Sequence, residues 1–393
     1  MGLRVLVLTT SYPLRATSSS GVFVRRLVEA LTAHAQMQVL CPADASAEPV
    51  DGGARVILLP FRYAPRRWQR LAQEPGGVLP AIRARPALLL LLPWFLLAFS
   101  WRLVRAARRV DVIHANWAIT GALAALLRPL HRRPVVLTLR GDDVTVARRS
   151  GIHRHLLHYS VAHAHTVVCV AESMARNLEA EVPASAPKVR VVLNGVGGEF
   201  RPPVAASGFP ARIVFVGSLI PRKGADVLLR AFARMQDSAV VLRFVGDGPE
   251  RASLQSLGRS LAVDDRLEFC GQVAPEQVAD HLAASTLFVL PSYSEGRPNV
   301  LLEAMAGGVP VVASRIDGVV DTVREGEHAW LFDAGDVDAL TVVLNDAMAR
   351  PEERQRRALA ARRHVEISGW SWEAAARRYA DIFAAAASRS GVA

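Results

Sequence analysis

Two glutamates are the residues of this chain whose type and spacing point most directly to chemistry. Glu295 lies in a segment rich in Gly and Pro, and Glu303 lies eight positions later in a run of good helix formers. A helix that begins near Pro298 would direct the amides of its first turn outward at the positive end of its dipole, where an anionic diphosphate fits. Carboxylates beside a diphosphate make sense when they accept hydrogen bonds from hydroxyl groups, which sugars and ribose supply. We therefore interpret this segment as a nucleotide-sugar site.

A rare lysine is the third candidate. Of the 47 strong cations only Lys188 and Lys223 are lysines, and Lys223 lies in a turn after an apolar run. A compact point charge suits a phosphate cluster. The alternative is that Glu295 is a solvated loop residue and Glu303 an exposed helix charge, which is the usual fate of glutamate. The small residues nearby, Gly296 among them, favour a close ligand over a merely solvated loop.

The rest of the chain predicts the elements that position these residues. Short apolar, β-branched runs alternate with helical stretches, which predicts parallel sheets covered on both faces. The expected strands of the first half are 5–9, 39–41, 56–59, 112–115, 135–139, 166–170 and 189–193. Those of the second half are 213–216, 240–245, 267–270, 287–290, 309–313 and 329–332. The fold class is therefore α/β, with two doubly wound, Rossmann-like domains.

A Gly- and Pro-rich segment, 197–210, reads as the linker between the two domains. We expect an acceptor-side domain over 1–200, a donor-binding domain over 201–368, and a last helix within 369–393 that packs back on the first domain. The central cleft between two such domains is the expected ligand site.

The positive charge of the chain is concentrated in its first half. Residues 1–200 carry 25 Lys and Arg against 12 Asp and Glu, and ten arginines lie between 62 and 109 around the apolar run 87–101. That run is shorter than a bilayer span needs and contains Pro93, so we expect no transmembrane helix. Segment 83–109 either lies on an anionic membrane surface or is a core helix with solvated arginines. Its aromatic residues are not interleaved with the cations, so we expect no nucleic acid binding.

The cysteines and the first residues favour a cytoplasmic protein, peripheral on the inner face of the cytoplasmic membrane if 83–109 binds lipid. Cys41, Cys169 and Cys270 lie in apolar runs at wide spacing, which predicts buried thiols in a reducing compartment. Residues 1–10 read as a first strand without the features of an export signal.

With these motifs in place, the chain resembles the retaining glycosyltransferases of family 4, also called group 1, which have the GT-B fold of two Rossmann-like domains. The resemblance covers nearly the whole length and is closest to bacterial members that build surface polysaccharides. It is carried by Glu295 and Glu303 in their context, by the segments 215–224 and 245–249, by 194–196 before the linker, and by 21–24.

The resemblance implies a role for each matching residue. Lys223 should neutralise the donor diphosphate, Glu295 should contact the transferred sugar, and Glu303 should hold the ribose hydroxyls. The rest of the donor site would be formed by Gly21, Ser218, Arg222, Gly246, Val273, Gly296, Arg297, Asn299 and Val300. The partners would be a nucleotide-sugar donor and a glycan or lipid-linked acceptor, and no cofactor is expected beyond the sugar nucleotide.

Several positions depart from the family pattern. The family usually has arginine at Ser218, so the second phosphate cation is either supplied by Arg222 or Arg297 or is missing. Asn116 and Arg140 both stand where histidines are common. In a retaining front-face reaction the leaving phosphate takes the acceptor proton, so Asn116 would position the acceptor hydroxyl rather than act as a base. His114 and Asp143 complete the expected acceptor side, unless they only bond loop amides.

Other readings remain open. The five histidines between 153 and 165 lack the spacing and carboxylates of a helical zinc site, and Asp336 in an Asp-Val-Asp sequence reads as a helix cap, so we expect no metal. A sugar-nucleotide epimerase on the same fold, or a non-catalytic nucleotide-sugar-binding relative, would also fit the residues.

Overall fold

The computed structural model describes residues 2–14, 18, 20–43, 55–69, 71, 78, 81–82, 85–148, 150–200, 202 and 211–389. The chain divides into two compact units. Unit 1 comprises Met1–Asn194 together with Trp372–Ala393, and unit 2 comprises Gly195–Ser371. Most of the predicted linker and Arg83 of the predicted membrane segment lie outside the described residues.

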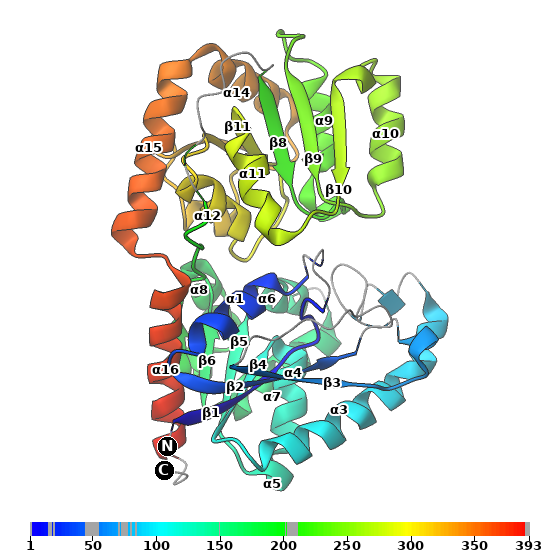
Figure 1. Ribbon diagram of the computed structural model, residues 1–393, viewed down its shortest axis with the longest axis vertical. Helices are drawn as coiled ribbons and strands as arrows, with labels where there is room; N and C mark the ends of the chain where they lie inside the picture. The colour runs from blue at the N-terminus through cyan, green and yellow to red at the C-terminus, as the bar shows by residue number, and fades with distance from the viewer. Residues whose placement is uncertain are drawn as a thin grey trace. The chain divides into compact units, whose positions relative to one another are not determined.

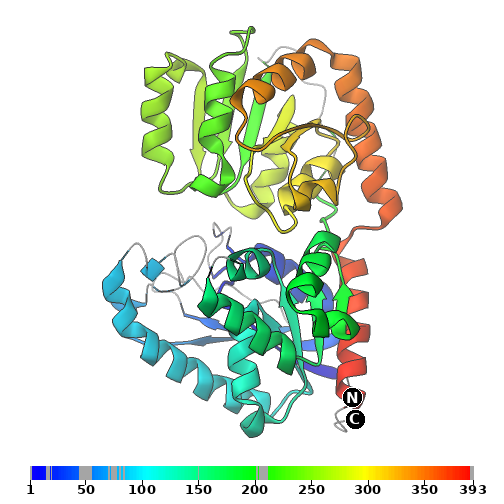
Figure 2. The same cartoon turned by 180° about the vertical axis from the view of Figure 1, so that it is seen from behind.

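The sheet of unit 1 has seven parallel strands in the order β3-β2-β1-β4-β5-β6-β7 (Figures 1 and 2). Its strands are β1 (Leu3–Leu8), β2 (Ala35–Pro42), β3 (Val56–Phe61), β4 (Val112–Asn116), β5 (Val135–Leu139), β6 (Thr166–Cys169) and β7 (Val189–Val191). Alternate residues of β1 enter two different cores: Leu6 and Leu8 pack on one face, and Val5 and Val7 on the other. This two-sided burial explains why the strands read as continuous apolar runs.

Helices cover both faces of this sheet. The helical elements of unit 1 are α1 (Val22–Leu31), η1 (Arg66–Trp68), η2 (Pro86–Leu91), α3 (Leu92–Ala107), α4 (Ala118–Leu126), α5 (Arg128–His131), α6 (Asp142–Ala147), α7 (Gly151–His163), α8 (Glu172–Glu181), η3 (Pro183–Lys188) and α16 (Trp372–Arg389). The last helix, α16, packs beside α1 and buries Tyr379 and Phe383 against the sheet, although it lies at the opposite end of the sequence.

The sheet of unit 2 has six parallel strands in the order β10-β9-β8-β11-β12-β13. They are β8 (Arg212–Val216), β9 (Val241–Val245), β10 (Leu267–Gly271), β11 (Leu287–Leu290), β12 (Val311–Ser314) and β13 (Ala329–Phe332). The helical elements are η4 (Pro221–Lys223), α9 (Ala225–Phe232), α10 (Arg251–Ser260), η5 (Asp264–Arg266), η6 (Pro275–Gln277), α11 (Val278–Ala283), α12 (Asn299–Ala306), α13 (Asp317–Val320), α14 (Val337–Ala349) and α15 (Pro351–Ser368). Every predicted strand is present, and the prediction of two doubly wound α/β domains is confirmed.

Each sheet has a point at which the strand order reverses. In unit 1 the chain returns to the centre at β4, which pairs with β1, and in unit 2 it returns at β11, which pairs with β8. The loops at the carboxyl ends of such a strand pair diverge to opposite sides and leave a crevice that open α/β sheets use for ligands. Lys223 and Glu295 lie in the loops after β8 and β11, and Asn116 is the last residue of β4.

The apolar segment 87–101 differs from its prediction. The helical stretch Pro86–Ala107 is 22 residues long and contains an 18-residue window with a mean hydropathy of 2.0, so by length and composition alone it would reach across a bilayer. Pro93 does not interrupt it, because it occupies the first turn of α3, where its missing N–H has no intrahelical partner. Phe95, Phe99 and Leu103 are buried on one side of α3 and anchor it to the core of unit 1.

The sequence predicted that all three cysteines are buried, but only two of them are. Cys41 and Cys169 lie inside unit 1, and burial raises the pKa of each thiol to about 12. Cys270, which lies on the edge strand β10, is exposed.

Candidate functional site

A buried ion pair lies at the strand reversal of unit 2. Lys223 ends the turn η4 after β8, and Glu295 lies in the loop after β11. The lysine Nζ is 2.5 Å from Oε1 of the glutamate, and the two side chains are 16% and 8% exposed. The structure therefore brings together the lysine and one of the two glutamates that the sequence singled out, across 72 residues of chain.

Further contacts keep Glu295 ionised. Arg222 Nη1 lies 3.6 Å from Oε2, and the hydroxyl of Ser292 donates a hydrogen bond of 2.8 Å to Oε1. Burial by itself would raise the pKa of Glu295, but the charges of Lys223 and Arg222 and the hydrogen bonds from Lys223 and Ser292 outweigh it and lower the pKa. Two cations therefore face one carboxylate at this point of the sheet.

Glycines let the surrounding loops approach each other. Gly224, beside Lys223, has a φ of +63°, and a Cβ there would lie 2.2 Å from the carbonyl oxygen of Pro291. A Cβ on Gly246 would lie 2.0 Å from the carbonyl oxygen of Gly217. Both glycines are therefore required by packing at the carboxyl end of the sheet, whatever ligand binds there.

The helix α12 presents its predicted ligand residues on one side. Asn299, Val300 and Glu303 are partly exposed, whereas the opposite side, including Leu302 and Met305, is buried. No side chain caps the N-terminus at Pro298. The amide of Leu301 in this first turn bonds the Pro298 carbonyl at 3.1 Å, and the anion site at this helix start stays a prediction.

Arg297 occupies a different position from the one predicted for a phosphate cation. Its guanidinium lies 4.4 Å from the ring centroid of Trp370, and its Nε and Nη2 have no hydrogen-bond partner among the described residues. Burial lowers the pKa of Arg297 to about 10, against the opposing effect of Asp321. In the described part of the chain it makes no ion pair or hydrogen bond with Glu295, so Arg222 is the second cation at the pair.

The remaining predicted donor residues lie in the loops around this cluster. Ser218 is partly buried in the loop after β8, where its carbonyl accepts the amide of Ile220. Val273 follows β10 and packs at the margin of the core that contains α12. Gly296 directly follows the buried carboxylate, and its carbonyl oxygen would lie 2.6 Å from a Cβ on Gly318.

The acceptor-side candidates of unit 1 are organised by Arg140. This guanidinium donates to the amide oxygen of Asn116 at 3.1 and 2.8 Å and to that of Asn194 at 3.0 Å. Asp143 accepts the backbone amides of Arg140 at 2.9 Å and Ala118 at 2.8 Å. Burial lowers the pKa of Arg140, although nearby Tyr379 and Asp143 oppose the shift. Arg140, which sequence reasoning treated as a departure, is the centre of this cluster.

The residue after Asn116 has a strained backbone. Trp117 has a φ of 69° and a ψ of 151°, a region that is essentially restricted to glycine. Its amide bonds the carbonyl of Thr138 at 2.9 Å, which holds the end of β4 in place. Strain of this kind costs about 1–3 kcal/mol and is concentrated at functional sites, where the surrounding structure supports it. No sequence signal reveals it.

His114 and Gly21, two predicted site residues of unit 1, are held by packing within that unit. His114 is 1% exposed, its Nε2 is 2.8 Å from the Thr138 hydroxyl, and its ring packs against Phe383 of α16. Burial, with a smaller effect of Arg140, lowers the pKa of His114 to about 3. This interior position is a correction to its expected place on the acceptor side. Gly21 has a φ of +75° and approaches the carbonyl of Ser11, where a Cβ would lie at 2.3 Å.

The acidic and histidine motifs lie outside these clusters. Asp336 caps α14 by accepting the amide of Ala339 at 2.9 Å, which confirms the predicted cap. Among the described residues no group of three or more His, Cys, Asp or Glu is placed to hold a metal ion. The sequence motifs do not identify Ser292 as a site residue. The signal that points to it is its position three residues before Glu295 in the same loop.

Comparisons with known proteins agree with this geometry. The family profile described as "Glycosyl transferases group 1" matches residues 199–364, and that described as "Glycosyl transferase 4-like domain" matches residues 19–195. A putative teichuronic acid biosynthesis glycosyltransferase, TuaC of Bacillus subtilis, is 28% identical over 362 residues, covering 83% of this chain and 84% of the relative.

A GDP-mannose-dependent α-(1-6)-phosphatidylinositol monomannoside mannosyltransferase of Mycolicibacterium smegmatis is 34% identical over 181 residues, covering 43% of this chain and 47% of the relative. The matched region spans about half the length of this relative and of the similar D-inositol 3-phosphate glycosyltransferases of Streptomyces. Among solved structures, Anabaena HepE has a TM-score of 0.79 at 19% identity, and sucrose-phosphate synthase of Thermosynechococcus elongatus has 0.81 at 22%. Each covers 98% of this chain and is matched over its full length, which shows the shared GT-B fold.

Proposed function

Because this chain belongs to the group 1 glycosyltransferase family, we propose that it is a retaining glycosyltransferase that moves a sugar from a nucleoside diphosphate sugar to a hydroxyl acceptor. The observation that carries the proposal is the cluster of Lys223 and Arg222 around the buried carboxylate of Glu295 at the strand reversal of unit 2. This cluster lies where open α/β sheets bind ligands. The GDP-mannose-dependent relative supports a sugar nucleotide as the donor.

The diphosphate would bind to Lys223, Arg222 and the uncapped first turn of α12. Removing the diphosphate from water is favourable only where such fixed cations and amides replace its hydration. Glu303, on the partly exposed side of α12, would accept hydrogen bonds from the ribose hydroxyls. The protein cations supply the charge neutralisation, so the proposal includes no metal ion or other cofactor.

Sugar transfer follows from this arrangement. The bond between the anomeric carbon and the diphosphate oxygen breaks, and the acceptor oxygen bonds to the same face of that carbon. The acceptor proton passes to the departing diphosphate. Lys223 stabilises the charge that develops on the leaving group, and the ionised Glu295 stabilises the positive charge on the sugar. Fixed charges of this kind need no reorganisation during the reaction, which is the main source of their effect.

The proposed acceptor is a glycan or a lipid-linked hydroxyl compound used in cell-surface polysaccharide or glycolipid synthesis. The printed names of the Bacillus and Mycolicibacterium relatives support this class. In unit 1, Asn116 is fully buried and bonds both Arg140 and the Leu8 carbonyl, so its proposed role is to orient the Arg140 guanidinium toward the acceptor hydroxyl. Asp143 acts on the same loops through the two backbone amides that it accepts.

The proposal places the protein on the cytoplasmic face of a membrane, in contact through α3. Leu90, Trp94, Leu97 and Trp101 recur at helical spacing and are 60–79% exposed. A helix in contact only with water would carry polar residues on that face, whereas tryptophans and leucines flanked by arginines suit a membrane interface. We expect Leu97→Asp to weaken binding to vesicles of anionic lipid without lowering thermal stability. Unchanged binding would contradict the contact.

A transfer assay tests the enzymatic proposal. A thermal-shift panel of nucleotide sugars identifies the donor, because a ligand that binds the folded protein raises its melting temperature. With that donor and membrane or glycan acceptors, Lys223→Ala should lower turnover by about 10²-fold, the typical effect of losing a charge-stabilising group. Lys188→Ala removes the other lysine, whose Nζ bonds only the carbonyl of Ala162 among the described residues, and should keep the wild-type rate. Equal rates for both variants would refute the assignment.

A further inference from the structure

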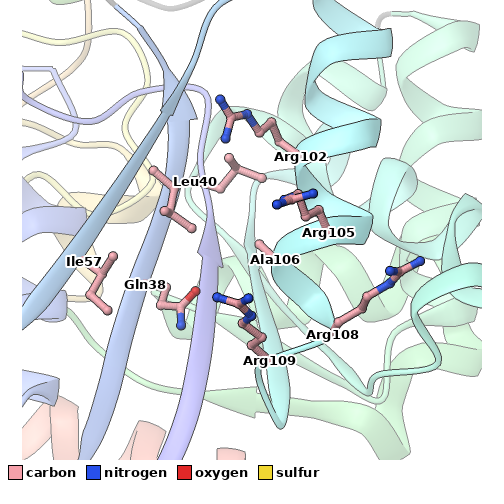
Figure 3. A pocket seen from close by; sticks show the side chains of 9 residues that line it. Gln38, Leu40, Ile57, Arg102, Arg105, Ala106, Arg108 and Arg109 are labelled. Atoms are coloured by element: carbon pink, nitrogen blue, oxygen red, sulfur yellow. The ribbon is translucent and has the colours of Figure 1, made fainter.

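A pocket lined by arginines lies between α3 and the strands β2 and β3. Its volume is about 370 Å³, and its apolar floor includes Leu40, Ile57 and Leu59. Arg102, Arg105, Arg108 and Arg109 also line it. In Figure 3 the side chains of Arg102, Arg105 and Arg109 extend from the helix segment toward the strands. The pocket therefore combines a cluster of cations with an apolar surface.

In the part of the chain that the structure describes, none of these four guanidiniums forms a salt bridge, whereas arginines such as Arg4 and Arg315 pair with carboxylates. Arg102 and Arg105 instead lie over the ring of Trp101, at 5.2 and 5.9 Å from its centroid. Like charges at three- and four-residue spacing on a helix repel each other. An anion with several oxygens would relieve this repulsion and fill the fork-shaped donors.

The apolar stripe next to the pocket indicates what kind of anion would bind there. The exposed stripe of Leu90, Trp94, Leu97 and Trp101 runs from η2 along α3 and ends beside the pocket-lining arginines. A ligand that contacts both regions has an apolar chain joined to an anionic group. A polyanion without apolar parts would leave the stripe in water.

We propose that this pocket binds the phosphate headgroup of an anionic membrane lipid, while the stripe lies among the acyl chains next to it. The proposal rests on the membrane contact of α3 stated above and adds a defined site to it. It differs from diffuse attraction to a charged surface, because a pocket depends on where a charge lies and not only on how many charges the protein has.

Substitutions of two glutamines on the same strand distinguish binding in the pocket from diffuse attraction to a charged surface. Gln38 lines the pocket, and Gln36, two residues away on the same face of β2, is exposed and does not line it. Gln38→Glu and Gln36→Glu change the net charge equally. Binding of each variant to phosphatidylcholine vesicles with and without phosphatidylglycerol is measured by flotation, and thermal unfolding confirms that both are folded. Should Gln38→Glu fail to fold, Arg105→Gln against the exposed Arg230→Gln makes the same comparison.

We expect Gln38→Glu to bind phosphatidylglycerol vesicles at least about fivefold more weakly than Gln36→Glu, since one charge near an anionic surface is worth roughly that factor. Equal weakening would overturn the pocket and leave the contact of α3 standing. Absence of wild-type binding to any vesicle would refute the contact itself, and neither result bears on sugar transfer. The last experiment measures thermal unfolding with soluble glycerol 3-phosphate. If this compound stabilises the wild type but not Gln38→Glu, while the two proteins bind vesicles equally, the site binds a free phosphate ester and the lipid proposal fails.

Discussion

Replacing Lys223 with alanine is expected to change both the stability of unit 2 and its dependence on pH. The substitution leaves the Glu295 carboxylate buried, with Arg222 at 3.6 Å and the Ser292 hydroxyl as its remaining partners. Breaking a buried pair costs about 3–5 kcal/mol. Because these partners remain, we expect about 2–3 kcal/mol near pH 7.5, or roughly 4–12 °C in melting temperature for a unit of this size.

The sign of the pH dependence follows from the pKa of Glu295. In the wild type that pKa is lowered, so the stabilisation is present above the unfolded pKa and is lost as the pH falls through the folded pKa. Without Lys223 the effect of burial dominates and raises the folded pKa. The protonated carboxyl is then tolerated at low pH, and stability is lost as the pH rises through the raised pKa. The difference between wild type and variant should therefore be small near pH 4 and largest near pH 7–8.

Urea unfolding followed by circular dichroism at several pH values measures this difference. The double variant Lys223→Ala/Glu295→Gln removes the unpaired charge, so we expect it to be more stable than Lys223→Ala at neutral pH and equal to it at low pH. Lys188→Ala is the matched control and should lie within about 0.5 kcal/mol of wild type. We attribute the loss of unfolding free energy in Lys223→Ala to a buried carboxylate without its partner. This explanation would be refuted if that loss were the same at all pH values, or if the double variant showed the same loss.

Two further predictions test the loops and the thiols. Gly224→Ala should destabilise unit 2 by more than about 1 kcal/mol, because its positive φ and the carbonyl of Pro291 leave no room for a Cβ; a melting temperature equal to wild type would contradict the geometry. Ellman's reagent should titrate one cysteine, Cys270, in the native protein and all three after unfolding, because Cys41 and Cys169 are buried. Rapid native reaction of a second thiol would contradict the burial of those two residues.

The strands and the donor-side loop could be predicted from the sequence because their signals are local. The central strands are buried on both faces, and each of the thirteen strands appears as a short apolar run, so the sequence predicts all of them to within a few residues. Gly224 and Pro298 likewise mark the turns beside Lys223 and α12 through their own backbone preferences. What these signals cannot supply is the order in which strands lie next to each other.

The unpredicted features depend on contacts between distant residues. His114 is a candidate through the resemblance of its segment to the family, but α16, from the far end of the chain, packs against it. Cys270 reads as buried because its strand is apolar, but β10 proves to be the edge of its sheet. Arg140 reads as a lost histidine, and only the spatial neighbours Asn116 and Asn194 show it to be the centre of a cluster. Burial and partnership at these positions are decided by topology.

The strand reversals explain why both clusters form where they do. Lys223 and Glu295 follow β8 and β11, which are adjacent only because the chain returns to the middle of the sheet after β10. The same return in unit 1 places Asn116, after β4, within 3.3 Å of the Leu8 carbonyl at the end of β1. Because the loops on either side of each reversal lead to opposite faces, helices cannot close over that point, and polar side chains there can reach a ligand. The chemistry of this chain therefore depends on sheet order as much as on the residues that its motifs display.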